Sequence, residues 1–268
     1  MSLNQAAEFK EISGAPLRIQ VGSNGSIQVY HQNHPADGST YGTADSGLFL
    51  ALGSDVYGPN LPNTNPTSAS ITTNPLTLVS HEGPIGSGSI SDPFKVVTSQ
   101  TLAGSGATLG VVQTVSYING NDYFRQDWAI TNNGTSETCF KAYHAADVYF
   151  AGSDTGAGYY NAASGSVGGY NAAQDWFMVF TPVTPVSHYQ EGSYSTDIWA
   201  TVQAAGDFKD TIVTESVDNG FGLQWNQCVQ PGQTTTISDL WSFGENEESV
   251  IPPTPEPTAV PAPPPPEV

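Results

Sequence analysis

The sequence predicts an all-β fold: a large, multi-stranded antiparallel β-sandwich that ends in a disordered, proline-rich tail. The first observation is composition, because the 268 residues include 28 Gly, 12 Tyr and 11 Phe but only 12% charged residues. Aromatic residues pack well on a pleated sheet, and glycine serves tight turns. The second is the Asn-Gly dipeptide, which suits the type I′ hairpin turn and begins at Asn24, Asn119, Asn133 and Asn219. The third is that no window keeps a 3.6-residue apolar period over three helical turns.

The clearest element is a three-stranded meander over residues 108–150, in which two Asn-Gly turns separate three alternating segments. Further strands are expected at 26–32, 47–52, 93–103, 176–183, 197–203, 222–230 and 234–243. A single all-β domain of this size is common.

Alternation assigns the faces of these strands. It places Cys139 on the more polar face of the segment 139–150, and Cys228 on the more polar face of 221–230. Two cysteines alone make neither a zinc site nor a C-x-x-C pair. We therefore expect a Cys139–Cys228 disulfide, which favours an oxidising compartment.

The chain divides into three parts. Residues 1–19 are expected to be an N-terminal extension whose first three residues, Met1 to Leu3, we interpret as an expression remnant in place of a removed signal peptide. A cytosolic protein with its natural start is the alternative. Residues 20–244 are expected to form one β-sandwich domain, and 245–268 an acidic boundary followed by a linker. That linker holds 9 of the 20 prolines and should adopt an extended polyproline conformation, typical of a spacer.

The charge balance excludes some partners. The chain has 25 acidic and 6 basic residues, a net charge of −19, and its six basic residues are scattered. Nucleic-acid binding needs clustered Lys or Arg, so we expect no nucleic-acid partner. No apolar stretch reaches the roughly 20 residues that span a membrane, so no membrane insertion is expected. The oligomeric state is left open.

The densest polar cluster surrounds the end of the third meander strand. A histidine, carboxylates and tyrosines at a strand-to-loop junction suit a sugar site, because rings stack on C–H patches while polar groups bind hydroxyls. The ligand-binding candidates are Arg125, Tyr143, His144, Asp147, Tyr149, Asp154 and Tyr159. Two other interpretations stand beside this one: His144 as a core histidine on the apolar face of its strand, and Arg125 in a surface ion pair with Asp127.

A metal is the less favoured use of this cluster. Asp147 and Asp154, with loop carbonyls, offer the oxygen ligands that calcium takes, but the D-x-D-x-D-G pattern is missing. We expect no other cofactor.

The order of segments resembles a known family. DWAITNNGTSETCFKAYHAADVYF followed by LQWNQCVQPGQTTTISDLWSF is similar to the galactose mutarotase-like β-supersandwich superfamily. The resemblance covers residues 20–244 and implies that His144 matches the proton-transfer histidine of the sugar epimerases. Four residues separate His144 from Tyr149-Phe150, where the epimerases have the histidine directly before Tyr-Phe, and the nearest candidate for their glutamate base is Glu215.

These observations predict an extracellular or cell-surface β-sandwich module that binds carbohydrate, such as a cell-surface glycan, without catalysis. Standard catalytic signatures such as G-x-S-x-G and H-E-x-x-H are missing. One alternative is a mutarotase-like sugar epimerase or another carbohydrate-active enzyme that uses His144. The other is a purely structural or adhesion module with no small ligand.

Overall fold

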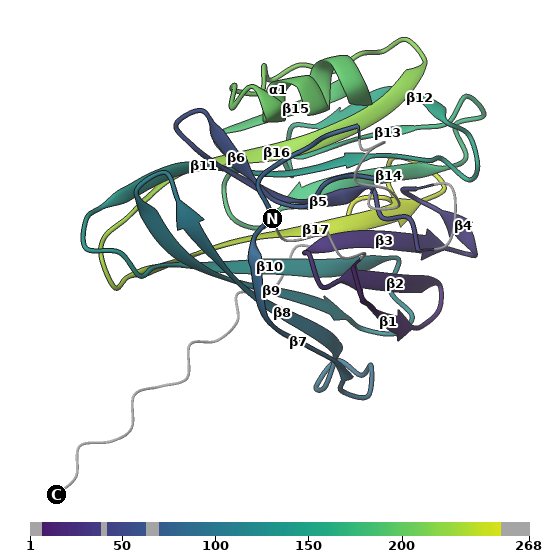
Figure 1. Ribbon diagram of the computed structural model, residues 1–268. Helices are drawn as coiled ribbons and strands as arrows, with labels where there is room; N and C mark the ends of the chain where they lie inside the picture. The colour runs from purple at the N-terminus through teal and green to yellow at the C-terminus, as the bar shows by residue number, and fades with distance from the viewer. Residues whose placement is uncertain (1–6, 39–41, 63–69, 253–268) are drawn as a thin grey trace, which may run out of the picture.

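Two antiparallel layers face each other in the computed structural model, which describes residues 7–38, 42–62 and 70–252 (Figure 1). Layer 1 has the strand order β1–β2–β3–β5–β11–β16–β15, with β4 paired to β3 and β6 paired to β5. Its strands are β1 (Phe9–Ser13), β2 (Leu17–Gly22), β3 (Ser26–His31), β4 (His34–Pro35), β5 (Ser46–Leu52), β6 (Asp55–Tyr57), β11 (Thr138–Asp147), β15 (His188–Ser193) and β16 (Val217–Val229).

Layer 2 has the order β7–β8–β9–β10–β17–β14–β13–β12. Its strands are β7 (Thr77–Ile85), β8 (Phe94–Gly104), β9 (Ala107–Tyr117), β10 (Tyr123–Asn132), β12 (Thr155–Asn161), β13 (Ser166–Tyr170), β14 (Phe177–Pro182) and β17 (Thr234–Gly244). The layers meet where β12 pairs with β16, and β1 contacts β7 and β8 at the opposite edge, so the sheet is nearly closed. The predicted all-β sandwich is confirmed.

The alternation of the sequence decides which side chains fill the space between the layers. In β11, Phe140, Ala142, His144 and Ala146 turn inward, and in β10 the inward set includes Trp128. The apolar face expected for His144 is therefore correct. A core this continuous supplies the main stabilising term, because burial of apolar surface contributes about 25 cal/mol per Å².

The predicted disulfide is confirmed. Cys139 and Cys228 are register partners on β11 and β16, and their sulfurs are bonded. Both residues are exposed on the outer face of layer 1.

One predicted strand is wrong. Residues 197–203 are helical, with a π-helical turn η1 (Tyr194–Trp199) continuing into α1 (Ala200–Gln203). Ile198, Trp199 and Val202 are buried together, a spacing that suits a helix. A helical segment this short cannot show a period over three turns, which explains the wrong prediction.

The packed unit also extends on both sides of residues 20–244. β1 and the start of β2 lie within the expected N-terminal extension, and Val250 is buried against Phe177 and Val179 of β14. Met1 to Leu3 and the proline-rich segment from Pro253 lie outside the described residues. No helix of the described residues is long and apolar enough to cross a membrane.

Candidate functional site

The histidine singled out by the sequence lies in the interior of the sandwich. His144 is fully buried, its ring stacks on Phe180 at 3.9 Å between centroids, and its Nδ1 lies 2.5 Å from Oδ2 of Asp239. Its Nε2 lies 3.2 Å from Oγ of Ser46. Burial raises the pKa of Asp239, and the bonded imidazole of His144 opposes that rise. The pair joins β11 to β17 across the two layers, where a surface ligand does not reach it.

The structure separates the predicted site residues. Arg125 forms an ion pair with Asp127 on layer 2, at 2.7 Å from Nη2 to Oδ1, as one interpretation of the sequence expected. Tyr143 is buried, and Tyr159 packs edge-on against Phe177. Tyr149 follows β11, and its backbone N–H donates to the carbonyl of Ala36. Apart from the two aspartates, these residues do not form one site.

Asp147 and Asp154 are the exception. Carboxylate oxygens of Asp147, Asp154 and Asp218 lie within 4.8 Å of one another. The sequence suggested the first two, but it suggested only a turn for Asp218, because the pairing of β12 with β16 brings that residue to the group.

A helical cover lies on the outer face of layer 1. We name residues 194–210 the cover segment. Its residues Ile198, Trp199, Val202 and Phe208 belong to one buried cluster with Phe49, Tyr143 and Ala145 of β5 and β11.

Two glycines of β16 allow this close approach. A Cβ at Gly220 would lie 2.8 Å from Cα of Tyr194, and one at Gly222 would lie 2.7 Å from the ring of Phe208. Larger residues at these positions would push the cover segment away from the sheet. The turn expected at Asn219-Gly220 is therefore wrong: both residues lie within β16, and Gly220 and Gly222 leave room for the cover segment on its outer face.

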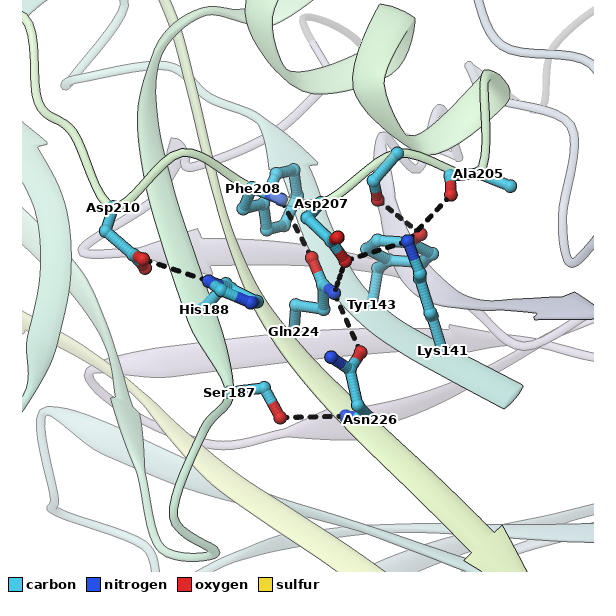
Figure 2. Close-up of polar contacts among 11 residues, drawn as sticks. Lys141, Tyr143, Ser187, His188, Ala205, Asp207, Phe208, Asp210, Gln224 and Asn226 are labelled. Atoms are coloured by element: carbon cyan, nitrogen blue, oxygen red, sulfur yellow. Dashed lines mark hydrogen bonds and ion pairs between the residues drawn. The ribbon is translucent and has the colours of Figure 1, made fainter. Parts of the chain in front are cut away.

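Beside the cover segment, polar side chains gather around the buried Gln224 in a group that we call the polar network: Lys141, Ser187, His188, Asp207, Asp210, Gln224 and Asn226 (Figure 2). Lys141 Nζ lies 2.8 Å from Oδ1 of Asp207 and donates to the carbonyl of Ala205 at 3.0 Å. The hydrogen bonds from Lys141 and Gln224 lower the pKa of Asp207. The carboxylate therefore stays charged although it lies on a strongly acidic chain.

Gln224 holds the middle of the network. Its side-chain amide donates to Oδ1 of Asp207 at 2.6 Å and to Oδ1 of Asn226 at 2.8 Å, while its oxygen accepts from the backbone N–H of Phe208 at 2.8 Å. The Asn226 N–H donates to Oγ of Ser187 at 2.9 Å. These bonds fix the exposed donors and acceptors in position.

A second ion pair completes the network. His188 Nδ1 lies 2.9 Å from Oδ2 of Asp210, whose other oxygen accepts from the N–H of Tyr189 at 3.0 Å. His188 and Gln224 are register partners on β15 and β16, so both ion pairs lie on one face of layer 1 (Figure 2).

Sequence reasoning did not select this network. Alternation put Gln224 and Asn226 on the polar face of 221–230 and Lys141 on the polar face of 139–150, and these were the available signals. Lys141, His188, Asp207 and Asp210 belong to three separate segments. They meet only because β15 and the cover segment fold against β16.

No family model and no curated protein matches this sequence. Solved structures do match. An Escherichia coli K12 protein provisionally assigned as an aldose 1-epimerase aligns with a TM-score of 0.52 at 10% identity, covering 89% of this chain and 99% of that one. A galactose mutarotase-like protein from Clostridium acetobutylicum aligns with a TM-score of 0.51 at 7% identity, over 90% and 100% of the two chains.

A bacterial glucoamylase complexed with acarbose aligns with a TM-score of 0.56 at 12% identity, and its matched part is 35% of that chain and 93% of this one. The fold of this chain is therefore similar to the folds of galactose mutarotase-like proteins. This agrees with the resemblance carried by the sequence around His144.

Proposed function

We propose that this protein is an extracellular, non-catalytic β-sandwich module that binds carbohydrate through the polar network on the outer face of layer 1. The observation that carries the proposal is the network itself. Lys141, His188, Asp207 and Asp210 keep side-chain exposures between 31% and 52% although each is held by a partner. Such fixed, partly exposed donors and acceptors suit a ligand with many hydroxyl groups.

The position of His144 supports a role without catalysis. Proton transfer to a sugar requires the acid or base within hydrogen-bond reach of the ligand. His144 is fully buried and engaged by Asp239 and Ser46. The similar folds described as aldose 1-epimerase and as a glucoamylase complexed with acarbose support the carbohydrate class of ligand.

The exposed Cys139–Cys228 disulfide supports an extracellular or cell-surface location, because solvent-accessible disulfides persist in oxidising compartments. Thiol titration of the denatured protein, purified from its natural compartment, tests this. We expect no free thiol, and two free thiols would contradict the location.

A glycan array probed with the whole protein tests the binding, followed by titration calorimetry with the strongest glycan. We expect Asn226→Ala and Lys141→Ala each to weaken binding by about tenfold, because each removes hydrogen bonds or charge at the network. Asn121→Ala and Lys95→Ala are the matched controls on other parts of the surface, and they should bind as the wild type does.

Two results would contradict the proposal. The first is an array without a binder among plant, microbial and host glycans, which would favour a purely structural module. The second is unchanged affinity of both network variants for a glycan that the wild type binds.

A further inference from the structure

Four aspartates converge at one end of layer 1, although each comes from a different segment. Asp45 directly precedes β5, Asp147 ends β11, Asp154 directly precedes β12, and Asp218 is the second residue of β16. Three strand pairings bring them together: Ala146 with Ser46, Asp147 with Gly220, and Thr155 with Asp218. The fold therefore assembles the group.

The spacing of the carboxylates suits one ion. One oxygen each from Asp147, Asp154 and Asp218 lies within 4.8 Å of the others. Oxygens that share a calcium ion at 2.3–2.6 Å lie at most about 5 Å apart. The three carboxylates can thus reach a common centre without rearrangement of the strands.

A second, independent observation points to a ligand. Asp45 lies outside that group of three, is 4% exposed, and its Oδ1 is buried with no hydrogen-bond partner among the described residues. It adjoins the group, because its carbonyl accepts from the N–H of Asp147 at 3.0 Å and its charge acts on Asp147. Oδ1 of Asp147, a residue 8% exposed, is likewise buried without a partner. Buried carboxylate oxygens without partners are costly, so two of them on residues joined by a backbone hydrogen bond indicate a missing cation.

Among the described residues, no positive side chain is one of the charged groups that act on Asp147 or Asp45. Lys10, Arg125 and Lys141 form ion pairs with other carboxylates. The charged groups that act on Asp147 are Asp45, Asp218 and Asp154, all acidic. Burial, followed by these carboxylates, raises the pKa of Asp147 to about 9.

We propose that Asp147, Asp154 and Asp218, with Asp45 behind them, bind a calcium ion. Carboxylates alone suit a hard cation, whereas zinc prefers histidine and cysteine. Magnesium is usually held by one or two carboxylates and keeps several waters, so a set of three or four favours calcium. The exposed residue Asp154 leaves a route for the ion to enter. An ion here ties β11, β12 and β16 together where the two layers meet.

This site does not depend on the proposed carbohydrate binding. Asp218 and Asn226 are eight residues apart on β16, which places them about 27 Å apart along the strand. Loss of one function would leave the other measurable.

Titration calorimetry with calcium chloride on the EDTA-treated protein, together with thermal unfolding, tests the site. We expect one calcium ion per chain and a midpoint of unfolding that rises with calcium and falls again with EDTA. Asp154→Asn and Asp218→Asn should each weaken calcium binding by about tenfold or more. Asp175→Asn removes an exposed aspartate elsewhere and should bind calcium as the wild type does.

Asp147→Asn gives a readout that a merely damaged fold would not. It should raise the midpoint of the calcium-free protein, because an amide avoids the cost of burying this carboxyl group, and should abolish the further rise with calcium. The inference is overturned if calorimetry detects no heat of calcium binding and calcium does not shift the midpoint of thermal unfolding. It is also overturned if Asp154→Asn and Asp218→Asn bind calcium as tightly as Asp175→Asn.

Discussion

His144 and Asp239 face each other across the interior of the sandwich, with Nδ1 and Oδ2 2.5 Å apart and both side chains fully buried. His144 lies on β11 of layer 1 and Asp239 on β17 of layer 2. The histidine that resembles a proton-transfer group of the sugar epimerases therefore acts here as a polar link between the two layers.

Removal of either partner of this pair should destabilise the protein. Asp239→Ala or His144→Ala leaves a buried polar group without its partner, and we expect each to lower the free energy of unfolding by about 3–5 kcal/mol. The double variant should lose clearly less than the sum, because it leaves no orphaned partner. Urea unfolding of the four proteins measures this, and strictly additive losses would contradict the link.

The disulfide should stabilise the protein because it closes a long loop of the chain. Cys139 and Cys228 are separated by 89 residues, and the chain-entropy model gives such a crosslink at most about 4–5 kcal/mol. We expect dithiothreitol to lower the midpoint of urea unfolding, since the bond is exposed. The double variant Cys139→Ser/Cys228→Ser should have the lower midpoint of urea unfolding, and dithiothreitol should not change it. Equal wild-type midpoints with and without reductant would refute this prediction.

Gly222 should not tolerate a side chain. An alanine Cβ there would lie 2.7 Å from the Phe208 ring and 3.0 Å from the carbonyl of His144. We expect Gly222→Ala to cost about 1–3 kcal/mol and to loosen the cover segment, which limited proteolysis would detect. Gly206→Ala is the control within the cover segment, because its nearest contact would be an ordinary 3.4 Å. Equal proteolysis of both variants would contradict the role of Gly222.

Glu191 should make stability depend on pH. Its buried carboxylate accepts from the N–H of Val213 at 2.7 Å and from Nδ2 of Asn219 at 2.5 Å, while burial raises its pKa from 4.5 to about 7. The folded state therefore binds this proton more tightly than the unfolded state does. The stabilisation is complete below pH 4.5 and is lost as the pH rises through about 7.

As the pH rises from 5 to 8, the titration of Glu191 should lower the free energy of unfolding by about 1–3 kcal/mol. Glu191→Gln should lack that part of the pH dependence, and Glu215→Gln, an exposed control, should keep it. Urea unfolding at both pH values measures the difference. A Glu191→Gln variant with the wild-type slope would contradict the prediction.

The sequence by itself determined the fold class, the faces of the long strands and the disulfide. These depend on local information: the two-residue alternation around Phe140 and Trp225, the Asn-Gly turns at Asn24 and Asn119, and two cysteines that both fall on the polar face of a strand. The helical segment Tyr194–Gln203 was not predicted, because fewer than three helical turns carry too little periodicity. Its place is set by packing on Phe49 and Tyr143.

Only the tertiary structure decided the sites. Lys141 meets Asp207, and Asp147 meets Asp218, from positions more than sixty residues apart. His144 was placed correctly on its apolar face, but its partner Asp239 lies 95 residues away on the other layer. Alternation determines the face of the sheet on which a side chain lies. The pairing order of the strands, which the whole core determines, decides what that side chain meets.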